Sequence, residues 1–159
     1  MPHVTIEYMI MIPVLIAQIF LFPFFATVIM DTWVDSSSTL ELQETAAHIG
    51  SSIQQLYFTM NQESITNGAM KINLAIPPSI EGHVYTTTLR HMTHLDTSYE
   101  VMNVTLILVG TNAHASTLVT LGQNVDWQEN LAFNSTSNSL NLIANKTATS
   151  IWLSFGGGN

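Results

Sequence analysis

The sequence predicts an α+β fold, with a long N-terminal hydrophobic α-helix followed by a C-terminal antiparallel β-sandwich, Ig-like or similar. Three observations support this prediction. Glu7 is the only charged residue before Asp31, an amphipathic repeat follows, and short β-prone segments separated by turn-prone stretches come last. We therefore divide the chain into a helix over residues 1–62, hydrophobic over 4–30 and amphipathic over 31–62, and a globular β domain over 63–159.

The first part of the helix has the length and composition of a membrane span. Residues 8–30 carry no formal charge, and as a helix they would cover ~35 Å, enough for a hydrocarbon core of ~30 Å. Pro13 and Pro23 each remove one backbone donor and tend to kink such a helix. Gln18 lies between them, and a glutamine among apolar side chains is typically an interhelical hydrogen-bond partner.

The second part of the helix carries a regular apolar seam. Its members alternate at spacings of four and three residues, which is the pattern of a helix packing along another surface; they are Leu42, Ala46, Ile49, Ile53, Leu56 and Met60. We expect this seam to pack against the domain that follows. A helix from Val4 to Met60 would measure ~85 Å, so its first half must find cover in lipid or among copies of itself.

From Met70 onward the sequence becomes β-prone. The segments rich in β-branched and aromatic residues are 70–76, 83–89, 99–110, 116–121, 139–145 and 149–155. Turn-prone stretches separate them, namely Pro77-Pro78, "RHMTHLDTS", "GTNAHA", "GQNVDWQEN" and "NSTSN". Six or seven short strands without helical periodicity indicate a small antiparallel sandwich or barrel.

Charge and motif content exclude several classes of function. The net charge is −8, and the basic residues are only Lys71, Arg90 and Lys146, so that no basic patch exists to neutralise phosphates. We therefore expect no nucleic-acid binding. Cysteine is absent, and the chain has neither a Gly-x-Ser-x-Gly nucleophile motif nor a phosphate-binding loop. We predict no enzymatic activity and no cofactor.

The histidines give the best candidate for a metal site. His91-x-x-His94 forms a pair, and His83 and His114 lie elsewhere in the β region; imidazoles are common ligands of zinc and copper. Histidines on a surface or in a turn are the ordinary interpretation of such a pattern. We therefore predict no metal site.

Three Asn-X-Ser/Thr acceptor patterns lie in the β region, at Asn103, Asn134 and Asn145. Such patterns mark N-glycosylation in exported chains, so together they favour an extracellular location. The tryptophans are interpreted first as packing residues. Trp127, next to Asp126, is the one that could instead lie on an exposed surface and bind a partner.

The stretch "VTIEYMIMIPVLIAQIFLFPFFATVIM" places a glutamate a few positions into an apolar N-terminal helix. With the amphipathic half and the β domain that follow, it resembles the type IV pilin superfamily, especially archaeal pilins of adhesive pili and archaellum-like filaments. The resemblance implies a leader removed by a prepilin peptidase and a glutamate at the fifth position after the cut, which Glu7 holds if the mature chain begins at His3. It also implies a membrane-anchored subunit that assembles into an extracellular homopolymer.

Glu7 needs a partner if it is buried, because an unpaired buried carboxylate costs several kcal/mol. Near it in its own chain there are only the α-amino group and His3. In a filament, Glu7 of an incoming subunit could meet the α-amino group of a neighbour and set the axial register. The alternative is that Glu7 stays hydrated in the headgroup layer of a membrane.

We therefore predict a structural subunit of a pilus-like filament, with a membrane stage before assembly and candidate N-linked glycans. Its assembly residues are Glu7, Pro13, Gln18 and Pro23. The main alternative is a single-pass membrane-anchored extracellular β domain that does not polymerise. A third alternative, an anchored metal-binding or catalytic domain, depends on the histidines.

Overall fold

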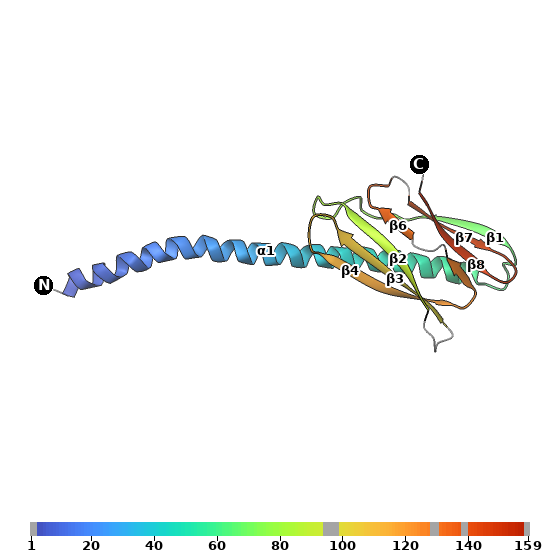
Figure 1. Cartoon of the computed structure of the whole chain (residues 1–159), viewed down its shortest axis with the longest axis horizontal. Helices are drawn as coiled ribbons and strands as arrows, with labels where there is room; N and C mark the ends of the chain where they lie inside the picture. The colour runs from blue at the N-terminus through green and yellow to red at the C-terminus, as the bar shows by residue number, and fades with distance from the viewer. Residues whose placement is uncertain (1–2, 94–98, 128–130, 138–139, 158–159) are drawn as a thin grey trace. The chain divides into compact units, whose positions relative to one another are not determined.

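The computed structural model describes residues 3–93, 99–127, 131–137 and 140–157, with the side chains of residues 3–8, 93 and 157 outside the description. Within these ranges the chain forms one helix and then eight strands, so that the predicted α+β architecture is confirmed (Figure 1). The elements are α1 (His3–Met60), β1 (Gly68–Asn73), β2 (Tyr85–Thr93), β3 (Tyr99–Leu108), β4 (His114–Gly122), β5 (Val125–Trp127), β6 (Leu131–Asn134), β7 (Leu140–Lys146) and β8 (Ile151–Gly157).

The helix α1 continues through both Pro13 and Pro23. The chain divides into two compact units, Met1–Ser37 and Ser38–Asn159. The second unit contains the helix from Ser38 onward together with the strands. It does so because this part of α1 buries its apolar seam among the inward side chains of the sheets.

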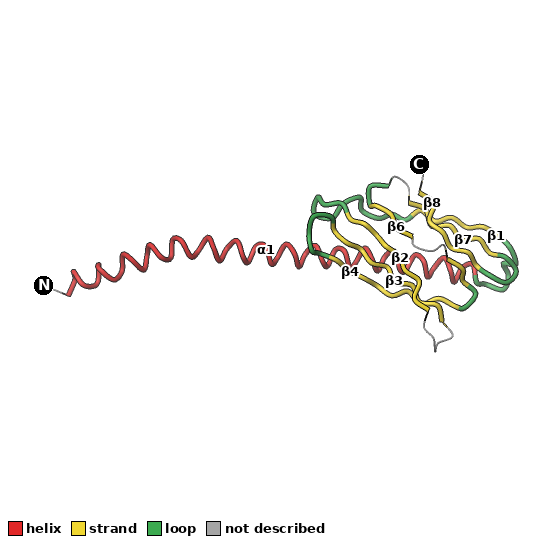
Figure 2. Tube along the Cα trace, viewed as in Figure 1, coloured by secondary structure: helices red, strands yellow, loops and turns green. Residues whose placement is uncertain are grey.

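The strands form two four-stranded sheets, with the orders β1-β7-β8-β5 and β4-β3-β2-β6 (Figure 2). Every strand pair is antiparallel except β5 and β8, which run parallel from Val125↔Ile151 to Trp127↔Leu153. The two sheets also meet through aromatic side chains, since the rings of Phe133 in β6 and Phe155 in β8 have centroids 5.4 Å apart. The result is a small sandwich.

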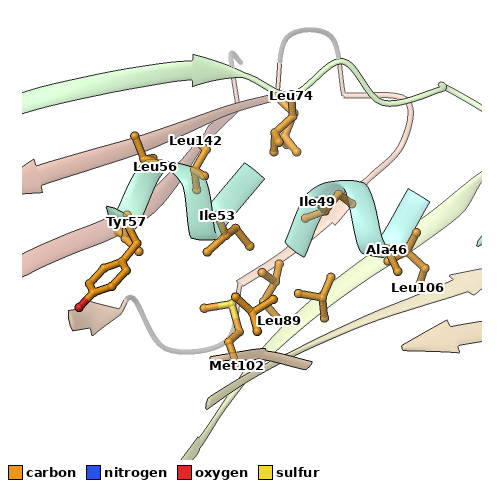
Figure 3. Packing of buried hydrophobic residues seen from close by; sticks show 14 of the residues in the cluster. Ala46, Ile49, Ile53, Leu56, Tyr57, Leu74, Leu89, Met102, Leu106 and Leu142 are labelled. Atoms are coloured by element: carbon orange, nitrogen blue, oxygen red, sulfur yellow. The ribbon is translucent and has the colours of Figure 1, made fainter. Parts of the chain in front are cut away.

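The predicted seam of the helix is confirmed as part of the core. All six of its members, from Leu42 to Met60, are at most 2% exposed. Figure 3 shows Ile49 and Ile53 with Leu142 on one side and Leu89 on the other, so the helix contacts side chains of both sheets. Burial of apolar surface at about 25 cal/mol per Å² makes this seam the main attachment of the helix to the strands.

A close contact with Gly122 and two consecutive side-chain hydrogen bonds hold the end of α1 against β4. A Cβ atom on Gly122 would lie 2.1 Å from the hydroxyl oxygen of Tyr57. That hydroxyl donates to Asn124 Oδ1 at 2.9 Å, and Asn124 Nδ2 donates to Asn61 Oδ1 at 2.8 Å. The glycine therefore leaves the space that the tyrosine hydroxyl occupies.

A hairpin with a two-residue turn contacts α1 at Ser38, where the buried half of the helix begins. Ile80 and His83 exchange backbone hydrogen bonds of 2.9 Å in both directions. Glu81 and Gly82 between them have φ values of 49° and 80°, as a type I′ turn requires. This turn holds Glu81 where its carboxylate accepts a hydrogen bond of 2.5 Å from the Ser38 hydroxyl.

A buried polar network connects β6 to the loop before β2. Ser135 is 5% exposed, and its hydroxyl donates to the Pro78 carbonyl oxygen at 2.7 Å and accepts from the Tyr85 backbone amide at 3.2 Å. The Tyr85 hydroxyl donates to the Pro77 carbonyl oxygen at 2.7 Å. Burial raises the pKa of Tyr85 to about 12, because the charged phenolate loses hydration there.

Two turn expectations were wrong. "RHMTHLDTS" was expected to be a turn, but its first four residues continue β2, because they pair with β3 as far as Thr93↔Glu100. "GQNVDWQEN" was also expected to be a turn, but it contains β5, which is held by its pairing with β8. The strand β6, which lies between two predicted turns, was not anticipated.

Candidate assembly surface and modification sites

The first unit presents a continuous apolar surface. From Met9 to Met30 its large apolar side chains are each between 48% and 78% exposed. By length and composition, α1 is one helix able to cross a membrane among the residues described. We call the stretch from Met9 to Met30 the apolar segment.

The polar groups of the apolar segment are few, and its hydroxyl is satisfied locally. Thr27 Oγ1 donates to the Phe24 carbonyl oxygen at 2.8 Å, and just beyond the segment Thr32 Oγ1 donates to the Val28 carbonyl oxygen at 2.8 Å. Such back-bonding lets a hydroxyl lie in apolar surroundings without an unsatisfied donor.

Gln18 is the polar residue of the apolar segment whose side chain has no such hydrogen bond to its own helix in the described structure. It lines an open groove on the helix surface beside Pro23, and the rest of this groove is apolar: Leu15, Ile19, Leu21, Phe22 and Phe25. No described residue forms a hydrogen bond with its side chain. A carboxamide with free donors and acceptors in an apolar groove is suited to bonding a second helix.

Glu7 lies in the first turns of α1 by its backbone. Its side chain is outside the description, as is that of His3. The expected pairing of Glu7 with an α-amino group therefore stays a prediction. The first acidic side chains that the structure describes are Asp31 and Asp35, both exposed, and they mark the polar end of the apolar segment.

The three candidate glycosylation sites have different environments. Asn103 lies in the middle of β3, and its Oδ1 atom is buried without a hydrogen-bond partner in the part of the chain that the structure describes. Asn134 is exposed at the end of β6, and Asn145 is exposed near the end of β7. The hydroxyl-bearing residues of the last two patterns, Thr136 and Thr147, are exposed as well.

The histidines of the candidate metal pattern are dispersed. His91 Nε2 pairs with Glu100 Oε2 across β2 and β3, whereas His114 Nδ1 lies 3.2 Å from the Asn112 carbonyl oxygen. His94 is outside the described residues. Among those that are described, no three histidine or acidic side chains are placed to hold a metal ion.

The tryptophans do not follow the packing interpretation uniformly. Trp127 opposes the buried Leu153 in the β5–β8 pair and packs against the core, as its first interpretation predicted, so the alternative of an exposed Trp127 was wrong. Trp152, one residue before Leu153, is on the opposite face of the sheet and is 44% exposed. Trp33 in α1 is 73% exposed. Strand alternation was the signal that could have separated Trp127 from Trp152.

Comparison with known proteins gives no match. No family model, no curated protein and no solved structure matches the chain.

Proposed function

We propose that this chain is the structural subunit of an extracellular type IV pilus-like filament that polymerises through its apolar segment. The second unit, Ser38–Asn159, which we call the β unit, would form the outer coat and serve in surface adhesion. The observation that carries the proposal is the exposure of the apolar segment. Soluble monomers rarely expose contiguous apolar patches of more than a few hundred Å².

The magnitude of the exposed surface decides what can cover it. The apolar segment presents on the order of 2,000 Å² of apolar side-chain surface, and burial is worth roughly 25 cal/mol per Å². Leaving this surface in water would therefore cost a monomer tens of kcal/mol of free energy relative to covering it. Lipid would cover these residues before assembly, and identical helices would cover the same residues after assembly.

Two polar groups, one in the apolar segment and one just before it, support the assembled state over the lipid state. Gln18 has free hydrogen-bonding groups in an apolar groove, and a neighbouring helix can satisfy them where lipid tails cannot. Glu7 has the same requirement for a partner, and the α-amino group of a neighbouring subunit would meet it with an opposite charge. The two groups would set the axial register of a homopolymer.

The β unit supports an outside location. Its candidate glycosylation sites at Asn134 and Asn145 are exposed together with their threonines. Its acidic surface, with a net charge of −8 for the whole chain, makes nucleic acid a poor partner. The coat would therefore meet solvent, glycans and the surfaces of other cells.

The test separates the filament from the anchored alternative. Cells that produce the full chain are sheared, and the released material is examined by negative-stain electron microscopy and by immunoblotting. We expect filaments that contain the chain. Recovery of the chain only as detergent-solubilised monomers from the membrane fraction would refute polymerisation and support the single-pass anchored β domain.

A substitution tests the pairing of the carboxylate. Glu7→Gln removes the charge but keeps the shape, so we expect filament yield to fall while the amount of folded subunit in the membrane is unchanged. Glu41→Gln is the matched control, because Glu41 is an exposed helical glutamate beyond the apolar segment. Filament yield equal to that of the wild type in the Glu7 variant would contradict the pairing.

A further inference from the structure

We infer that Asn145 is a glycosylated asparagine of this chain and that Trp152 is the platform against which its first sugar ring packs. The inference rests on the extracellular location proposed above. It adds which of the candidate sites is used and which side chain receives the sugar.

Strand register places the two residues together. Asn145 in β7 and Trp152 in β8 are directly opposite each other in an antiparallel pair, where the Cβ atoms of such partners lie about 4.5–5.5 Å apart on one face. The face is the outer one, because Ala144 and Leu153, their chain neighbours, are fully buried on the other side. A sugar linked to Asn145 Nδ2 would begin beside the indole ring.

The neighbours in the same cross-strand row leave one aromatic surface for the sugar. On the other side of Asn145 the register partner is Ala69, which is small, and beyond Trp152 it is Asp126. The face of an indole carries partial negative charge and attracts the C–H groups on the apolar face of a sugar ring. The exposed carboxylate of Asp126 can accept hydrogen bonds from sugar hydroxyls.

Asn145 also lies where an enzyme can reach it. It is exposed, and the chain enters the β7–β8 turn two residues later. Thr147 and Ser150 close that turn through a backbone hydrogen bond of 2.9 Å from the Thr147 amide to the Ser150 carbonyl oxygen. The asparagine therefore sits on a defined strand end, with the sequon threonine exposed beside it.

The other two candidate sites lack this arrangement. Asn103 is in a strand paired on both sides, between Arg90 and Leu118, and its Oδ1 atom is buried. A glycan there would have to displace its neighbours. Asn134 is exposed but has Thr86 as its register partner, which offers no aromatic face.

Glycopeptide mass spectrometry tests the site. The full chain is isolated in detergent from the cells that naturally make it, with the filament and membrane fractions analysed separately. We expect a glycan on Asn145 and an unmodified Asn103. A bare Asn145 would overturn the inference even if filaments form, whereas glycosylated monomers would refute the filament and leave the inference standing.

A thermal-unfolding cycle tests the platform on the glycoprotein from the same cells. Asn145→Gln should lower the melting temperature by about 2–4 °C, which corresponds to roughly 1 kcal/mol for a chain of this size, and the drop should vanish when Trp152 is replaced by threonine. Trp152→Phe keeps an aromatic face and should retain most of the drop. Asn134→Gln, the control, should change the melting temperature little. If Asn145→Gln lowers the melting temperature equally with tryptophan and with threonine at position 152, the proposed role of Trp152 is refuted.

Discussion

Replacing Gly122 by alanine should loosen the attachment of the helix end to β4, and the effect should depend on one oxygen atom. The backbone of Gly122 is outside the left-handed region, so that alanine can adopt it, but the new Cβ would lie 2.1 Å from the Tyr57 hydroxyl oxygen. The hydroxyl or the strand must then move by more than about 1 Å to restore an ordinary contact of ~3.5 Å.

The expected cost follows from two terms. Forcing an extra methyl group into a packed site costs about 1–3 kcal/mol. Moving the tyrosine also breaks its 2.9 Å hydrogen bond to Asn124, which is worth about 0.5–1.5 kcal/mol. We expect Gly122→Ala to lower the free energy of unfolding by about 2–4 kcal/mol.

Tyr57→Phe removes the obstructing oxygen and serves as the matched background. Alone it should cost about 0.5–1.5 kcal/mol for the lost hydrogen bond. With phenylalanine at 57, the nearest remaining atoms lie 3.2 Å from the new Cβ, so the alanine should cost less than about 1 kcal/mol. The double-mutant cycle should therefore show a coupling of at least about 1 kcal/mol.

The assay is equilibrium urea unfolding of the full chain in a mild non-ionic detergent. Tryptophan fluorescence can follow it, because Trp127 packs against the core, and the unfolding midpoint and slope give the free energy. If Gly122→Ala costs the same with tyrosine and with phenylalanine at position 57, the close approach of the hydroxyl is not the cause and the reasoning fails.

Three further predictions concern the β unit. Ile53→Ala should lower the free energy of unfolding by about 2–5 kcal/mol in the same assay, because Ile53 is fully buried; a loss below 1 kcal/mol would mean that the seam is not packed in solution. Ser135→Ala should cost about 1–3 kcal/mol by leaving buried backbone groups unpaired, with the Asn134 sequon intact; an unchanged melting temperature would contradict this. Since burial raises the pKa of Tyr85 from 10.0 to about 12, the unfolded chain loses that proton first, and stability should fall between about pH 10 and pH 12. In Tyr85→Phe this part of the fall should be absent.

The helix was predictable because its two halves carry strong local signals. The apolar segment is marked by the absence of charge, and the seam from Leu42 to Met60 by a regular period. Both signals come from residues close in the chain, and the seam is buried as that period requires. Neither signal depends on knowing what the helix packs against.

The missed strands depend on partners far away in the chain. β5 has only three residues and is held by parallel pairing to β8, and β6 has four and pairs with β2. Local composition could not reveal such pairings, because the polar residues around them are also typical of turns. The same holds for the end of β2, whose strand conformation is set by β3.

The candidate site was predictable in part. The sequence locates the apolar segment and the three sequons. The face of the sheet on which a strand side chain lies, however, is known only once the pairing register of that strand is known. The register distinguishes the exposed Trp152 from the inward Trp127 and places Asn145 opposite Trp152. Composition alone treats the three sequons as equivalent.

The position of β8 determines when the β unit can be completed during synthesis. This strand is the next-to-last in its sheet, with β7 on one side and β5 on the other, yet it is synthesised after all the other strands that the structure describes. Until Ile151–Gly157 has emerged, β5 has no strand beside it and β7 has one open edge. The apolar segment precedes every described strand in the chain, so it is synthesised well before this sheet closes.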